Sequence, residues 1–216
     1  QSIVSYTGTG SNATVGHGLA SAPELIIAKN REHSADWAVG GDDIGSWSNQ
    51  TLELNNTAAI VTDSNIFGAD PTTSLFTIGT SWKTNRSSYD HIAYCFHSVT
   101  GYSKIGSYTG SGSSGNAITT GFAPAFVIVK NATAIQDWQI LDNTRDSHDP
   151  RTKRLEPNNA DAEVDDTSYN NCIFTSTGFT WQADGGNTNA SGQTYVYMAF
   201  ADKREYAYWL DQSGNN

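Results

Sequence analysis

The sequence predicts an all-β protein made of two tandem β-sandwich, jelly-roll-like units with mainly antiparallel strands. Short apolar runs bounded by Pro or Asn recur along the chain, and Gly or Asn clusters return about every 8–12 residues, the spacing of a sandwich or barrel. No long window keeps the helical period of about 3.6 residues. The motifs of the first half also return in the second half in the same order.

Four apolar runs are the clearest strand candidates. Residues 24–29 and 125–130 are bounded by Pro and Asn, are too short for helices, and are rich in Ile, Val and Phe. Residues 91–97 and 195–201 are runs of the same kind, which we expect to be central strands. The best candidate for a helix is the segment 202–210.

Internal repeats divide the chain into two units. The opening motif Ser5–Ser11 returns as Ser107–Ser113, and the offset between matched residues drifts only from 101 to 104 along the chain. We therefore predict units at 1–103 and 104–206, followed at 207–216 by the start of a further segment or tail. Because the junction is only a few residues long, we expect the units to meet in a fixed geometry. The other matched pairs are Ala22–Asn30 with Ala123–Asn131, Asp36-Trp37 with Asp137-Trp138, Leu52–Asn56 with Leu155–Asn159, Phe76 with Phe179, Thr84-Asn85 with Thr188-Asn189, and Ile92–Phe96 with Val196–Phe200.

The composition excludes several classes of partner. The chain has 12 basic and 22 acidic residues, a formal net charge of −10, which argues against nucleic acid and against an anionic membrane surface. No apolar stretch approaches the about 20 residues of a membrane span, so no membrane insertion is expected. Gly, Ser, Thr and Asn carry the solubility, as in extracellular β-proteins and virion fibres. We therefore expect a virion or extracellular location and, because the chain opens on Gln1, a piece of a longer polypeptide.

The two cysteines are too few for a disulfide-stapled scaffold. Cys95 lies in the apolar run Ile92–Phe96, so a buried free thiol is the expected state.

The tryptophans fall into two groups. Trp37 and Trp138 occupy matched positions, each after an Asp, and a duplicated fold keeps its packing residues, so both are expected inside a sandwich core. Trp47 and Trp82 have no counterpart in the second unit and lie in polar surroundings. They are the candidate ligand-binding residues, as stacking surfaces for sugars. The alternative for both is an indole that merely covers loop or interface surface.

No motif of the chain indicates a catalytic, metal or cofactor site. The G-x-S-x-G and H-E-x-x-H signatures are absent, and the glycines of Gly110–Gly115 precede no helix that could hold a pyrophosphate. His91, Cys95 and His97 share one strand face but span about 20 Å, too far for one metal ion. The acidic runs 142–149 and 161–166 are expected to be solvated loops, with loop-bound Ca²⁺ as the alternative. A carboxylate pair for glycan hydrolysis has no sequence spacing and stays open.

Several of the repeated motifs resemble a known family. Ile105–Gly110, Gly121–Lys130, Asp137-Trp138 and Thr194–Phe200 resemble a tandem repeated domain of unknown function found in tail-fibre-like and other virion proteins of marine bacteriophages. The segment 208–216 resembles the lead-in to a further β domain in such proteins. The resemblance implies a virion module and carries over no catalytic or binding residues. Departures in the first unit, at His17–Leu19 and before Phe76, argue against equal functions of the two units.

The sequence therefore predicts a non-enzymatic virion surface or tail-fibre module. It would be a rigid β spacer whose loops bind a host cell-surface glycan, as part of a homo-oligomer that raises weak affinities by avidity. Two alternatives stay open. One is a glycan depolymerase, and the other is a purely structural capsid-decoration or filament subunit whose partner is another virion protein.

Overall fold

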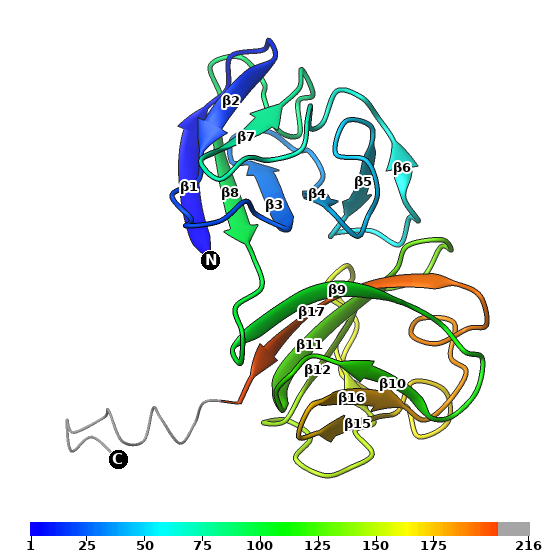
Figure 1. The fold of residues 1–216 in the computed structure, drawn as a ribbon. Helices are drawn as coiled ribbons and strands as arrows, with labels where there is room; N and C mark the ends of the chain where they lie inside the picture. Colours follow the sequence, from blue (N-terminus) through cyan, green and yellow to red (C-terminus); the bar gives the residue numbers. More distant parts are fainter. Residues whose placement is uncertain (203–216) are drawn as a thin grey trace, which may run out of the picture.

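The computed structural model describes residues 1–202, and within them every regular element is a β-strand (Figure 1). The predicted all-β, mainly antiparallel class is confirmed. The four predicted apolar strands appear within one residue of their expected ends. The two expected at 91–97 and 195–201 are inner strands of their sheets, as predicted. The predicted segment 207–216, and all of the helix candidate 202–210 except Asp202, lie outside the described residues. No helix that could span a membrane occurs between residues 1 and 202.

The first half of the chain forms one large sheet and one small one. The large sheet has the order β1-β8-β3-β4-β5-β6, and the antiparallel pair β2-β7 forms the small sheet. The strands are β1 (Ser2–Thr7), β2 (Ala13–Gly16), β3 (Leu25–Asn30), β4 (Ala38–Gly41), β5 (Gln50–Glu53), β6 (Val61–Thr62), β7 (Leu75–Ile78) and β8 (Asp90–Phe96).

The second half forms a four-stranded sheet, a three-stranded sheet and a short pair. Their orders are β12-β11-β17-β9, β10-β16-β15 and β13-β14. The strands are β9 (Ser103–Thr109), β10 (Asn116–Thr119), β11 (Pro124–Asn131), β12 (Gln139–Asp142), β13 (Lys153–Arg154), β14 (Val164–Asp165), β15 (Cys172–Thr175), β16 (Gly178–Trp181) and β17 (Thr194–Ala201).

The two halves have the same strand order and the same local pairing. The order β1-β8-β3-β4 of the first half is the order β9-β17-β11-β12 of the second. In the short strands, Thr51 pairs with Val61 as Arg154 pairs with Val164. Among the described residues of the first half, no strand corresponds to β15. An isolated bridge between Phe67 and Ile78 takes the place of the pairing between Cys172 and Trp181.

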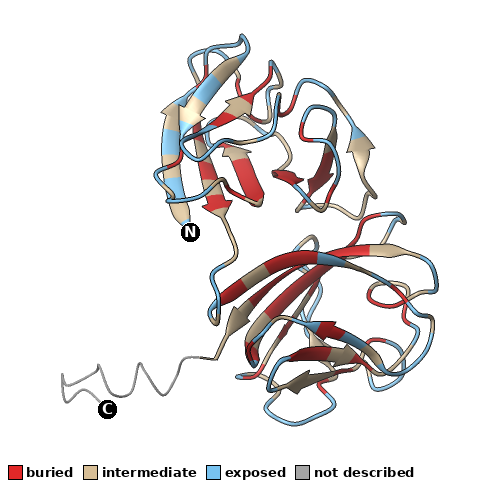
Figure 2. Ribbon diagram, viewed as in Figure 1, coloured by how far each residue is buried: buried red, intermediate tan, exposed pale blue. Residues whose placement is uncertain are grey.

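Each half has its own core, and a third apolar cluster joins the two. The side chains of Ile26 and Phe76 belong to the core of the first half, and those of Val127 and Phe179 belong to the core of the second. The third cluster lies where the outer faces of the two large sheets meet (Figure 1). Buried segments accordingly follow β3, β8, β11 and β17 in both halves (Figure 2). The result is a stack of four sheets. The buried members of the joining cluster are Leu25, Ile27, Val39, Ile44, Leu52, Ile105, Ile128, Ala132, Trp138, Val196 and Met198.

Trp37 and Trp138 belong to the joining cluster and not to a sandwich core, which corrects the sequence interpretation. Trp138 is buried, and its Nε1 donates a hydrogen bond across the junction to the carbonyl oxygen of Glu53 at 2.9 Å. Trp37 is half-buried and stacks on Tyr94, with ring centroids 6.3 Å apart. Each residue immediately precedes a strand of a large sheet, on the face that covers the other half, so the matched tryptophans hold the halves together.

Both cysteines are free and buried, as expected for Cys95. Burial raises the pKa of the Cys95 thiol to about 12, and that of Cys172 is also raised by burial. Neither side chain is available as a nucleophile near neutral pH.

Candidate ligand-binding site

Two matching loops, 81–89 in the first half and 185–193 in the second, are pinned by the matched asparagines Asn85 and Asn189. Asn85 Oδ1 accepts from the amide of Thr9 at 2.7 Å, and its Nδ2 donates to the carbonyl oxygens of Ser11 and Gly79 at 2.7 and 2.6 Å. Asn189 makes the same set of bonds to Ser111, Ser113 and Ala183, at 2.9, 2.8 and 2.7 Å. Both side chains are fully buried. The frame of the two loops is therefore the same.

A second pair of matched asparagines fixes the tip of each loop. Asn30 Nδ2 donates to the carbonyl oxygen of Trp82 at 2.9 Å, and Asn131 Nδ2 donates to that of Gly186 at 3.0 Å. The Oδ1 atom of each asparagine also accepts two backbone amides of its own turn, including that of His33 in the first half.

The backbone conformation of the two loops is also the same, although the residues differ. Ser88 has a φ of 63° and Gly192 a φ of 73°, and each amide donates at 2.9 Å to the glycine carbonyl that follows the opening strand. Glycine adopts this left-handed conformation without steric cost, whereas a residue with a Cβ does not. Among the described residues Ser88 is the one non-glycine residue with positive φ. The first half thus has a serine at a left-handed turn position where the second half has a glycine, which adopts this conformation at lower energy.

The side chains carried by the two frames differ completely. His33, Trp82, Arg86 and Tyr89, here called the aromatic cluster, gather at the 81–89 loop. The Arg86 Cζ atom lies 4.7 Å from the ring centroid of Trp82 and 4.2 Å from that of Tyr89. His33 meets Trp82 edge to face, with centroids 5.5 Å apart. The corresponding residues of the second half are Ala134, Gly186, Ala190 and Gln193.

The aromatic cluster presents a fixed ring surface to solvent. Trp82 is 62% exposed although the guanidinium of Arg86 stacks on it, and the cation–π attraction stabilises this arrangement of the two side chains. The Nη1 atom of Arg86 is buried and has no hydrogen-bond partner within residues 1–202. The arrangement combines an exposed indole with a nearby cation. Flat apolar rings with a polar group beside them suit ligands that have both apolar and hydroxyl faces.

Comparison with known proteins identifies the family of the chain. A family model described as a domain of unknown function, DUF7483, matches residues 1–204. The chain belongs to the DUF7483 family. The match runs through both halves of the DUF7483 domain, so the division at 103/104 stays a prediction. Searches of curated proteins and of solved structures found no match.

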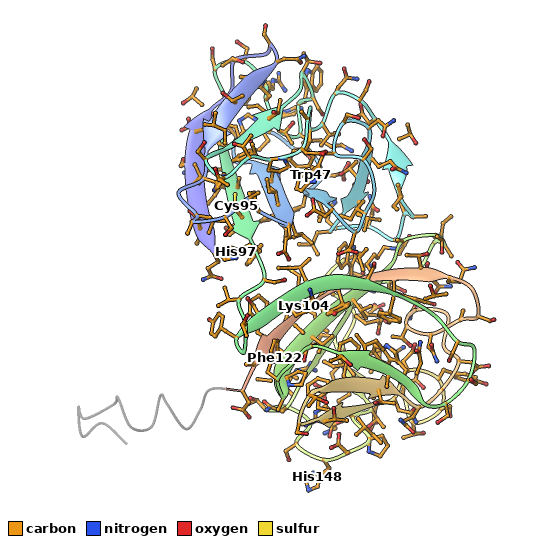
Figure 3. All side chains as sticks on the ribbon, viewed as in Figure 1. Trp47, Cys95, His97, Lys104, Phe122 and His148 are labelled. Atoms are coloured by element: carbon orange, nitrogen blue, oxygen red, sulfur yellow. The ribbon has the colours of Figure 1, made fainter. Side chains whose placement is uncertain are left out.

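Trp47 of the DUF7483 domain is a core residue, so the prediction that it binds a ligand was wrong. It is 3% exposed, its Nε1 donates to Asp42 Oδ1 at 2.7 Å, and its ring meets Phe67 edge to face at 5.6 Å. Figure 3 shows it inside the first half. A Cβ on Gly40 would lie 2.7 Å from the Trp47 ring, so Gly40 of β4 makes room for the indole. Trp47 and Trp82 do not share a surface.

Carboxylates of the acidic runs 142–149 and 161–166, which were predicted to be solvated loops, form ion pairs with arginines. Asp142 Oδ2 lies 2.6 Å from Arg145 Nε, and the same guanidinium binds Glu163 at 2.7 Å. Arg154 likewise binds Asp166 at 2.6 Å. These carboxylates therefore serve as partners of the arginines, and loop-bound Ca²⁺ stays a prediction. No group of three His, Cys, Asp or Glu side chains in residues 1–202 has the geometry of a metal site.

The matched carboxylates Asp36 and Glu53 have structural partners as well. The side-chain amide of Asn55 donates to Asp36 Oδ1 at 2.9 Å and holds the pKa of this carboxyl below its usual range. Lys83 forms ion pairs with both Asp36 and Glu53. Through Lys83, these two carboxylates attach the 81–89 loop to the rest of the first half.

Proposed function

We propose that the chain is a non-enzymatic virion surface or tail-fibre module that binds a host cell-surface glycan through the aromatic cluster. One observation carries the proposal: the loop frames of the two halves are the same, and only the first carries an exposed indole with a guanidinium stacked on it. A frame preserved in both halves accounts for the asparagines and glycines. It does not account for an indole that is 62% exposed, whose burial elsewhere would stabilise the fold. A ligand-binding role for Trp82 accounts for it.

The spacer part of the proposal is supported by the joining cluster. Trp138, Leu25 and Val39 pack across the junction, and the void among them is about 10 Å³, no more than one water molecule needs. Backbone hydrogen bonds also cross it, from Ile60 N to Ala132 O at 2.9 Å and from Gln136 N to Thr57 O at 3.0 Å. We further infer that the DUF7483 domain is an internal duplication, which the matched strand orders and asparagine frames support. A rigid body of this kind keeps its loops at a fixed spacing in an oligomer, where avidity compensates for weak single sites.

The test is binding to host polysaccharide by the parent protein, Trp82→Ala and Tyr169→Ala. Tyr169 is the matched control because it is also 62% exposed but lies in the second half. We expect single-site affinity of about millimolar strength, lost in Trp82→Ala and kept in Tyr169→Ala, with equal melting temperatures. Equal binding by all three proteins would contradict the proposal.

The same samples separate the alternatives. Mass spectrometry of the polysaccharide after incubation should show an unchanged length distribution. Shortened oligosaccharides would identify a depolymerase. Absence of binding together with self-assembly in sedimentation would favour a structural subunit.

A further inference from the structure

A polar groove opens on the second half, away from the aromatic cluster. Its volume is about 450 Å³, and its two sides are the edge strands β9 and β10. Lys104, Ser107 and Thr119 line it from these strands, and Asp43 reaches its rim from the first half. Figure 3 shows Lys104 on β9, the strand that runs next to the junction of the halves.

Tyr197 directs an unpaired hydroxyl group toward this groove. The residue is 4% exposed, and its ring packs against Phe179 with centroids 5.4 Å apart. Its hydroxyl makes no hydrogen bond to any residue from 1 to 202, yet the residue lines the groove. The hydroxyl oxygen is open to the groove, where water or a ligand can complete its hydrogen bonding. Burial and the nearby Asp43 carboxylate raise the pKa of Tyr197 to about 12, so the hydroxyl remains a donor.

Glycine at position 106 creates the opening. Gly106 is the register partner of Tyr197, and a Cβ there would lie 2.8 Å from the tyrosine hydroxyl oxygen. At the corresponding place in the first half Val4 pairs with Ala93. In the first half the larger residue of the pair, Val4, is on the edge strand β1. In the second half the larger residue, Tyr197, is on the inner strand β17, and its hydroxyl group reaches the edge strand β9 beside Gly106.

The remaining groups of the groove complement a hydroxyl-rich ligand. Asp43 Oδ1 accepts from Ser107 Oγ at 2.6 Å, which leaves Oδ2 as an acceptor. The ammonium of Lys104 and the hydroxyl of Thr119 have no partner within residues 1–202 and can donate. One cation and one carboxylate cancel in charge. Ala117 and Ile118 add a small apolar surface, and the volume lies in the range of small-ligand sites.

We propose that this groove is a second binding site, which takes one neutral pyranose unit of a glycan. The hydroxyls of such a sugar both donate and accept, as the groove requires, and a neutral sugar matches a site whose two charges cancel. The inference rests on the groove alone and not on the aromatic cluster.

The test is titration of the ¹⁵N-labelled protein with the methyl glycosides of glucose, galactose, mannose and N-acetylglucosamine. Because single sugar sites bind at about millimolar strength, each is added to about 20 mM. At least one should shift the amide resonances of Gly106, Ser107 and Thr119 in a saturable way. Shifts confined to 81–89 would support the proposed function and overturn this inference, and so would the absence of any shift.

Variants then assign the contact. Tyr197→Phe should weaken binding at the groove at least tenfold without lowering the melting temperature, since the hydroxyl has no partner in the fold. Trp82→Ala should leave groove binding unchanged. Parent-like binding by Tyr197→Phe, or tighter binding of glucuronate or glucosamine than of every neutral glycoside, would overturn the assignment.

Discussion

The two halves of the DUF7483 domain share their frame and differ in what the frame carries. The asparagines, the loop hydrogen bonds and the order of the four main strands recur. The first half adds the aromatic cluster, and the second half adds the polar groove beside Gly106. Residues that recur are therefore structural. Residues that break the correspondence are where binding is to be sought.

The largest effect is expected where the halves meet, and it should be unequal between the matched tryptophans. Trp138→Ala removes a buried indole and its hydrogen bond, which should cost about 3–5 kcal/mol of unfolding free energy. Trp37→Ala should cost clearly less, because Trp37 is only half-buried. Urea unfolding of both variants measures the difference, and equal costs would show that the two tryptophans pack alike.

The next effect should be equal in the two halves. Asn85→Ala and Asn189→Ala each leave several buried backbone groups without a partner, at about 1–3 kcal/mol for each group. We expect both variants to lose several kcal/mol and to lose similar amounts. A large loss in one and none in the other, by the same urea method, would refute the shared frame.

Much of the fold could be predicted because its main strands are short apolar segments that can be recognised from the local sequence. The runs at 24–29 and 91–97 are apolar and bounded by turn residues, and they form strands β3 and β8. The faces through which the halves pack were not predicted, although Leu25–Ala28 is apolar at every position. Such a continuous run indicates a strand buried on both faces, here one face in a core and the other in the joining cluster.

The candidate site was predicted only in part. Trp82 lies exposed as expected, but the unmatched Trp47 is buried because Gly40 and Asp42 supply room and a hydrogen-bond partner. His33, Arg86 and Tyr89 were missed because they differ in residue type and because His33 lies far from the other two along the chain. Aligning the 81–89 loop with 185–193 would have found Arg86 and Tyr89, since alanine and glutamine stand in their places.

A smaller effect separates the two turns. Ser88→Gly should stabilise the protein by about 1 kcal/mol by removing left-handed strain, whereas Gly192→Ala should destabilise it by about the same amount. Nothing lies within 4 Å of a Cβ at Gly192, so the backbone alone decides the second change. Thermal unfolding of the pair checks both signs. A neutral result for both would mean that the loops relax freely.

The smallest effect is a pH response limited to the first half. Burial lowers the pKa of His91, whose Nε2 accepts from the amide of Arg86 at 3.4 Å, while Asp90 and Glu32 partly oppose the shift. Stability from neutral His91 is therefore present above pH 6.5 and is lost as the pH falls below that value. The second half has Tyr195 there. Amide hydrogen exchange at pH 7 and at about pH 5 should show faster opening of 81–89 than of 185–193, and equal changes would count against this role of His91.

The most direct test exchanges the side chains of one loop for those of the other. The triple variant Trp82→Gly, Arg86→Ala, Tyr89→Gln gives the first frame the residues of the second. We predict that its melting temperature stays close to that of the parent, because the asparagine frame is intact, and that binding of host polysaccharide at this loop is lost. A folded triple variant that binds as tightly as the parent would contradict the assignment of binding to the aromatic cluster.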